Sequence, residues 1–152
     1  MSTIGTIDGV ANAIIEKIDE NRAKLGNPQF VYEKVEDPAI LAENHLLPAI
    51  HVIPFAEGVD SVHSVIGSEI GHHEFAITII GTYDTRGVNE DLRMIREYGY
   101  ACVDLFKGKN SRVGNGFIHK ITVRFGAYAI VDRILQQYFL TLHVKAYDDG
   151  TP

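Results

Sequence analysis

The chain has 152 residues, of which 45% are hydrophobic and 22% charged, and its formal net charge is -6. This length and composition are typical of one globular domain spanning residues 1–152, and they exclude a disordered chain. The negative charge and the lack of a Lys/Arg-rich block argue against a protein that binds the DNA backbone tightly.

The sequence also lacks targeting signals. No apolar run is long enough to cross a membrane, and the N-terminus has neither the basic region nor the apolar core of a secretory signal. The single cysteine, Cys102, cannot form a disulfide within the chain, which favours a reducing compartment. We therefore expect a protein without a membrane partner that is made in the cytoplasm.

The first predicted element is an amphipathic helix. Ser2 or Thr3 can cap its start, and Gly26 followed by Pro28 predicts its end. Its apolar residues recur at spacings of three, four or seven: Ile4, Ile7, Val10, Ile14, Ile18 and Leu25.

Strands and a short helical turn are predicted next. We expect strands at residues 30–36, 46–55 and 73–83, with the helical turn at residues 40–46. In the second strand Ile50 and Val52 point to one side, with Ala49, His51 and Ile53 opposite. In the third, Phe75, Ile77, Ile79 and Tyr83 share a face.

A second helix is predicted from Asn89, a good N-cap, to about Gly108. Gly99 lies in its middle, which indicates a close approach to the sheet. Its apolar stripe consists of Leu92, Ile95, Cys102 and Leu105 or Phe106.

Two alternating strands close the chain. Residues 116–126 are expected to place Phe117, His119, Ile121, Val123 and Phe125 on one face, with a kink or bulge at Gly126 before residues 128–134. The last strand covers residues 138–147. The order of elements predicts an α+β fold in two layers, with a mainly antiparallel sheet packed against two α-helices.

The connection between the second and third strands is unusually long. Eighteen residues, 55–72, separate them, whereas hairpin connections usually need only about 2–5 residues. We expect a long loop or β-arm here that packs on a neighbouring subunit. Its candidate contact residues are apolar: Val59, Val62, Val65, Ile66 and Ile70.

The seven histidines are the strongest argument for an enzyme or a metal-binding protein. Zinc binds histidine and carboxylate, and the candidates are His51, His63, His72, His73 and His119. Adjacent strand residues point to opposite faces, however, so His72 and His73 do not readily share an ion. No HExxH, GxSxG or phosphate-loop motif occurs. We expect no catalytic residues, no metal and no cofactor.

Three basic residues, Lys120, Arg124 and Lys145, are expected on one open sheet face. Such a face can bind single-stranded nucleic acid where aromatic side chains interleave with the charges, but they are sparse here. A solvated strand face is the favoured interpretation. A general nucleic-acid-binding adaptor stays open as an alternative.

The run LPAIHVIP, the long connection after it, the strand HEFAITIIGTY and the helix from Asn89 together resemble phage tail terminator (tail completion) proteins of long-tailed phages. The resemblance follows the order of elements over residues 4–147. It carries no catalytic residues.

The resemblance implies a virion protein of the tail or neck, assembled in the host cytoplasm. It implies a homohexameric ring that caps the tail tube and docks to the head–tail connector, with double-stranded DNA passing through the lumen without sequence recognition. A different head–tail joining protein remains an alternative to the terminator.

Overall fold

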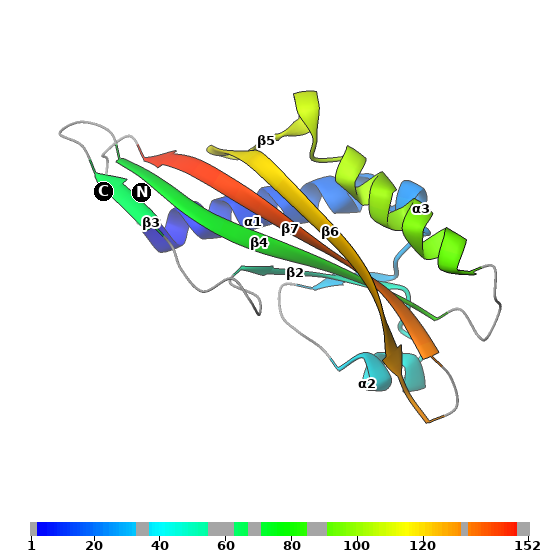
Figure 1. Ribbon diagram of the computed structural model, residues 1–152. Coiled ribbons are helices and arrows are strands. Elements are labelled where there is room, and N and C mark those ends of the chain that lie inside the picture. The colour runs from blue at the N-terminus through cyan, green and yellow to red at the C-terminus, as the bar shows by residue number, and fades with distance from the viewer. Residues whose placement is uncertain are drawn as a thin grey trace.

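A long, twisted β-sheet forms the centre of the molecule (Figure 1). The computed structural model describes residues 3–32, 37–54, 63–66, 71–84, 91–131 and 134–148. In chain order the elements are α1 (Thr3–Glu20), the 3₁₀ helix η1 (Arg22–Leu25), β1 (Phe30–Tyr32), α2 (Pro38–Glu43), β2 (Ala49–Pro54), β3 (His63–Ile66), β4 (Gly71–Asp84), α3 (Asp91–Asp104), the 3₁₀ helix η2 (Gly108–Asn110), β5 (Arg112–Val113), β6 (Gly116–Ala129) and β7 (Ile134–Asp148).

The strands follow the order β1-β2-β4-β7-β6-β5, with β3 paired to β4. Only β1 and β2 are parallel to each other; every other described pair is antiparallel. The longest ladder joins β4 to β7 from the Gly71–Asp148 pair to the Asp84–Leu135 pair. The predicted α+β architecture with a mainly antiparallel sheet is confirmed.

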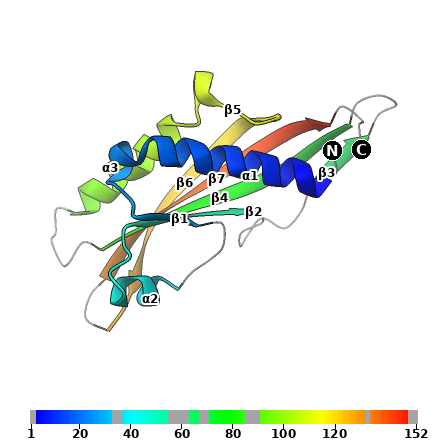
Figure 2. The same cartoon turned by 180° about the vertical axis from the view of Figure 1, so that it is seen from behind.

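Helices α1 and α3 pack on one face of the sheet, as Figure 2 shows for α1. The apolar stripe of α1 and the inward residues of β4 and β7 share one core. Its fully buried members include Ile14, Ile18, Leu25, Ile50, Val52, Ile77, Ile79, Ile95, Cys102, Phe106, Tyr138, Leu140 and Leu142. The predicted inward residues of β2 and β4 therefore lie in the core, as do the described members of both helix stripes; the side chains of Ile4 and Leu92 lie outside the described ones.

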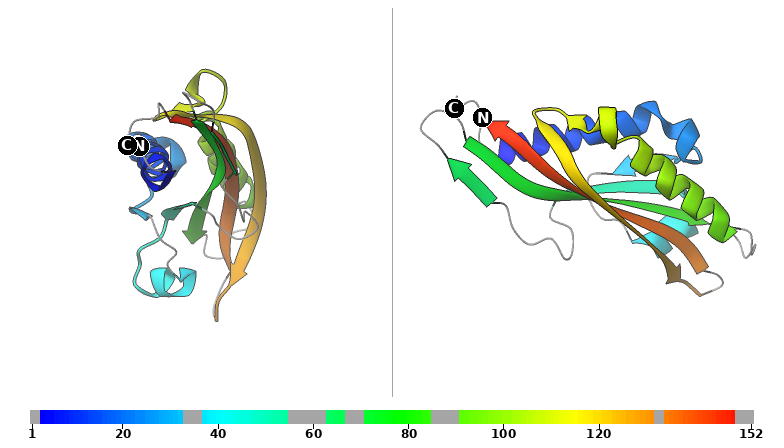
Figure 3. Two further views of the ribbon diagram at one scale, coloured as in Figure 1. Left: turned by 90° about the vertical axis from the view of Figure 1, so that its left-hand side faces the viewer. Right: turned by 45° about the horizontal axis from the view of Figure 1, so that its top comes forward.

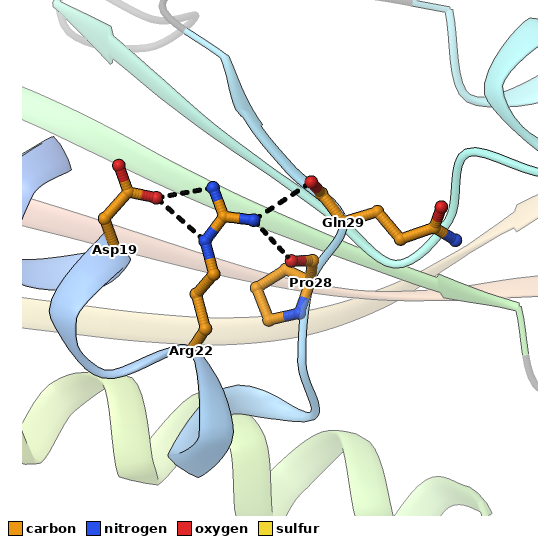
Figure 4. A network of polar contacts seen from close by, with 4 residues as sticks. All are labelled: Asp19, Arg22, Pro28 and Gln29. Atoms are coloured by element: carbon orange, nitrogen blue, oxygen red, sulfur yellow. Dashed lines mark hydrogen bonds and ion pairs between the residues drawn. The ribbon is translucent and has the colours of Figure 1, made fainter.

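The first helix ends earlier than predicted. The α-helix stops at Glu20, and the chain continues as η1 to Leu25 before Gly26 adopts a left-handed conformation (φ 81°). Arg22 fixes this corner: its guanidinium donates to Asp19 Oδ1 at 2.6 and 2.8 Å and to the carbonyls of Pro28 and Gln29 at 3.0 Å (Figure 4). One side chain thus links the end of α1 to the start of β1.

A second, smaller core lies on the opposite side of the sheet. Because side chains alternate along a strand, Ala49 and Leu135 point away from the main core. The helix α2 covers them with Leu41 and Ala42. Asp37 caps α2 by accepting from the Ala39 N–H at 2.9 Å, so the predicted helical turn is confirmed and begins with its own cap.

The alternation predicted for β6 is wrong at its start. A β-bulge lies between Ile118 and Lys120, whereas the register of β6 is unbroken at Gly126, so the bulge predicted as one alternative there is absent. An extra residue in one strand shifts the faces by one position. Ile118 therefore joins Ile121 on the core side, while Phe117 lies on the outer side with Lys120.

Two glycines allow close packing. A Cβ on Gly99 of α3 would lie 2.7 Å from a ring carbon of Phe125, which confirms the predicted close approach of this helix to the sheet. A Cβ on Gly81 of β4 would lie within 2.6 Å of three Tyr138 side-chain atoms, two ring carbons and the hydroxyl oxygen. Tyr138 is fully buried, so its ring has no room to withdraw.

We predict that Gly81→Ala destabilises the protein by about 1–3 kcal/mol, the usual cost of overpacking a core. The matched control is Gly9→Ala in α1, where an added Cβ meets nothing within 4 Å. That change is expected to stabilise the helix by about 0.5–1 kcal/mol. Urea unfolding of both variants measures the difference; equal stabilities would contradict the packing described for Tyr138.

Candidate assembly surfaces

The long connection contains a strand. β3 pairs with β4 through four positions, from the His63–Glu74 pair to the Ile66–Gly71 pair. β2 pairs further along the same edge of β4, from Ala49–Thr82 to Pro54–Ile77. β2 and β3 therefore run in the same direction, end to end, along one edge of β4.

This arrangement places two of the five candidate contact residues. Val65 and Ile66 lie in β3, whereas Val59, Val62 and Ile70 lie outside the described residues. β3 and the first half of β4 extend the sheet beyond β2 at the end where the chain termini lie (Figure 1). The β-arm is thus an extension of the central sheet. Its contact with a subunit remains a prediction.

The three predicted basic residues lie on the outer face of the sheet, away from α1 and α3. Lys120 and Arg124 are exposed on β6, and Lys145 is half-buried on β7. Each has a neighbour on that face. The Arg124 guanidinium lies 4.1 Å from the centre of the Phe139 ring, and Lys145 Nζ lies 3.4 Å from Glu74 Oε1.

Two histidines join this face. The ring of His119, at the bulge of β6, lies 6.3 Å from that of His143 on β7, and Lys120 is the cross-strand neighbour of His143. Partial burial lowers the pKa of His143 below its usual 6.5, and the positive charge of Lys120 lowers it further. His143 is therefore largely neutral at pH 7, and the face owes its positive charge to Lys120, Arg124 and Lys145.

Three of the other histidines lie close together along the pairing of β3 with β4, where the register places His63 opposite Glu74, Ser64 opposite His73 and Val65 opposite His72. His51 is buried in β2, and His45 is exposed after α2. Within the residues that the structure describes, no group of three or more His, Cys, Asp or Glu side chains is placed to hold a metal ion. The absence of a metal site from the whole chain remains an expectation.

Cys102 belongs to a buried polar cluster beneath α3. Tyr83 donates a hydrogen bond to the Leu25 carbonyl at 2.6 Å, its oxygen lies 3.4 Å from that of Tyr138, and its ring stacks on Tyr98. Burial raises the pKa of the Cys102 thiol to about 12. The thiol is therefore protonated at neutral pH and is a poor nucleophile.

The sequence analysis did not predict an apolar surface at the C-terminal end of β6 and the N-terminal end of β7. A cavity of about 490 Å³ opens there between α3 and the strand ends, lined by Ile95, Arg96, Phe125, Gly126, Ala127, Ile134 and Gln136. Nearby, Tyr128, Val131 and Ile134 are exposed. The apolar run AYAIV was the available signal, but it is equally typical of a buried strand.

None of the described helices has the length and apolar character needed to cross a membrane. No protein-family model matches the chain, and no curated protein matches it. The fold is similar to that of a chain in a solved structure described as "Virion of native gene transfer agent (GTA) particle". The TM-score is 0.61 at 14% sequence identity, and the similarity covers 94% of this chain and 98% of the other. At this identity, the structural similarity shows a shared fold alone.

We predict that Cys102 reacts with a disulfide reagent at pH 8 at least about 100-fold more slowly in the native protein than in denaturant, because the buried thiol is protonated and inaccessible. The control carries Cys102→Ser and Lys109→Cys, which moves the only thiol to an exposed position. It should react rapidly in the native state. Rapid native labelling of Cys102 itself would contradict the buried environment.

Proposed function

We propose that this chain is a structural virion protein that forms a ring at the end of a phage-type tail tube and joins it to the head connector. The observation that carries the proposal is the end-to-end similarity to a chain of the gene transfer agent virion, with 94% of this chain and 98% of the other covered. The order of elements that resembles tail terminators supports the same role.

The geometry supports assembly more than catalysis. The buried Cys102 is not activated, and the basic side chains are spread over an open sheet face instead of converging in a cleft. The molecule instead offers long strands with accessible edges, an arm, and exposed apolar side chains at the far end of β6 and β7. We therefore propose a non-enzymatic role without metal or cofactor.

In this role the partners are other copies of the chain, the tail tube protein and the head–tail connector. Double-stranded DNA passes through the lumen without sequence-specific contact. A net charge of -6 suits such a passage, since a strongly basic ring would hold the DNA by its phosphates. The protein would reside in the tail or neck of the particle after assembly in the host cytoplasm.

We predict that the native mass is a ring multiple of the 16.9 kDa chain, six-fold for a hexamer, in solution or when tail tube protein is added. Light scattering coupled to size exclusion measures it under both conditions, because the tube end supplies a template for the ring. Negative-stain images should show the ring at one end of the tube. A strictly monomeric chain that leaves the tube unbound would contradict the proposal.

We also predict that deleting residues 58–70 leaves a folded monomer and abolishes the ring. No described core residue lies in this segment, and residues 55–57 and 71–76 still connect the cross-strand neighbours Pro54 and Ile77. Circular dichroism checks the fold, and sedimentation measures the assembly.

The matched control keeps the chain length and replaces Val59, Val62, Val65, Ile66 and Ile70 with serine. Loss of the ring in both variants identifies apolar contact as the cause. A deletion variant that still sediments as a hexamer would exclude the arm from assembly.

A further inference from the structure

We infer that the open edge of β6 in one copy docks against the exposed side of α1 in the next copy. This inference rests on the proposed ring and names the two surfaces that close it. The β6 surface consists of Lys120, Thr122 and Arg124 with the adjoining apolar cavity. The α1 surface consists of Asp8, Asn12, Ile15 and Glu16 with the adjoining end of β2.

The edge of β6 is the longest accessible edge of the described sheet. β6 has fourteen residues, but β5 pairs only with Gly116 and Phe117. From Ile118 onward, therefore, no described strand covers this edge. An open edge presents unpaired backbone N–H and C=O groups, which makes it a ready surface for another chain.

The charge of this region is one-sided. β6 carries two basic residues, Lys120 and Arg124, and no Asp or Glu. Lys120 and Arg124 are exposed on the outer side of β6. On the helix side of the same strand lies the apolar cavity of about 490 Å³, with the half-exposed Ile134 at its rim. A partner of this edge must be acidic and partly apolar.

The exposed side of α1 has that character. Between Thr3 and Glu20 the helix carries four acidic residues and one basic residue: Asp8, Glu16, Asp19 and Glu20 against Lys17. Asp8, Asn12 and Glu16 are exposed and lie four residues apart, so they form one row along the helix. Beside the row is a cavity of about 270 Å³, lined by Asp8, Ala11, Asn12, Ile15, Val52 and Pro54.

The two surfaces lie on opposite sides of the molecule. In the end-on view of Figure 3, α1 lies on one side of the curved sheet and β6 forms the other. A contact between two different surfaces of the same chain repeats from copy to copy, and it produces a ring when the rotation closes. Their opposite charges set which surface meets which and repel like edges.

Double-stranded DNA is the competing occupant of a basic edge. The chain favours a second copy for two reasons. The net charge of -6 disfavours the binding of DNA by the whole protein. Every further copy of the chain, in contrast, carries the acidic row of α1 that the basic edge can bind. The apolar cavity next to the edge also matches protein side chains better than phosphates. Use of this edge for DNA binding in place of ring contacts would overturn the inference.

The test reverses the charges of each surface in the full-length protein. Variant A carries Lys120→Glu and Arg124→Glu, which makes both of its surfaces acidic. Variant B carries Asp8→Lys and Glu16→Lys, which makes both basic. Because like surfaces repel, A alone and B alone should lose the ring. An equimolar mixture of A and B has opposite charges at every contact and should regain rings in which A and B alternate.

Native mass spectrometry at about 0.15 M salt, where surface charges interact over about 8 Å, resolves these species. The control variant carries Lys24→Glu and Glu43→Lys, which are exposed residues outside both surfaces, and it should assemble like the wild type. Circular dichroism of A and B establishes that each one folds.

Each outcome separates the inference from the proposed function. Rings formed by A alone or B alone would overturn the inference and leave the ring intact. So would a mixture that stays monomeric although both variants fold. Loss of DNA retention in A without loss of the ring would assign the basic edge to DNA. A wild-type chain that stays monomeric with and without tail tube protein would overturn both.

Discussion

The pairing of β4 with β7 is the constraint on which the rest of the structure depends. Fourteen consecutive residue pairs join these strands, and the inward side chains of both form the floor on which α1 and α3 pack. The side chain of Tyr138 on β7 packs against Gly81 of β4, contacts the ring of Tyr83 and lies next to Gly99 of α3. Because neither glycine has a side chain, β4 and α3 can both approach the buried ring of Tyr138 on β7 closely.

A central ladder of this length has a consequence for the edges. β4 and β7 are longer than the strands that flank them on one side, so β2 and β3 divide a single edge between them. On the other side β6 follows β7 for its whole length but has β5 beside it only at its start. The sheet is therefore well ordered in its centre and open at its margins. Such margins suit a subunit of a larger assembly, and the bulge and the charges of β6 prevent indiscriminate pairing of its edge.

The distribution of charge fits this arrangement. The formal net charge of -6 hides a basic strand, β6, and an acidic first helix. Each surface alone is unremarkable, since exposed strands and helices are usually charged. β6, which carries Lys120 and Arg124, lies on the other side of the curved sheet from α1, and the inferred contact pairs these two surfaces between successive copies.

Much of the fold follows from local sequence. The spacing of Ile7, Val10, Ile14 and Ile18 predicts the first helix and its buried side, and the alternation of Phe75, Ile77 and Ile79 predicts the inward face of β4. The β-bulge of β6 did not follow, because His119 satisfies the alternation whether or not an extra residue is present. The long connection was predicted as a loop or β-arm, but the position of β3 within it did not follow, since a run of four residues carries too weak a pattern.

The candidate surfaces, too, were partly predictable from the sequence. The apolar residues of the long connection and the basic residues Lys120, Arg124 and Lys145 could be named from the sequence alone, and the three basic residues do share the outer face. The charge asymmetry was also present in the sequence. The sequence did not show that the basic and acidic residues lie on different sides of the molecule. Strand order and sheet curvature determine that arrangement.

The sequence by itself thus determined the class of fold, the buried faces of its helices and the lack of a catalytic motif, because these depend on periodicity and residue type. Only the tertiary structure decided the register of β3, the change of face in β6 and the opposition of the α1 and β6 surfaces. These depend on contacts between residues far apart in the chain, which no local pattern encodes.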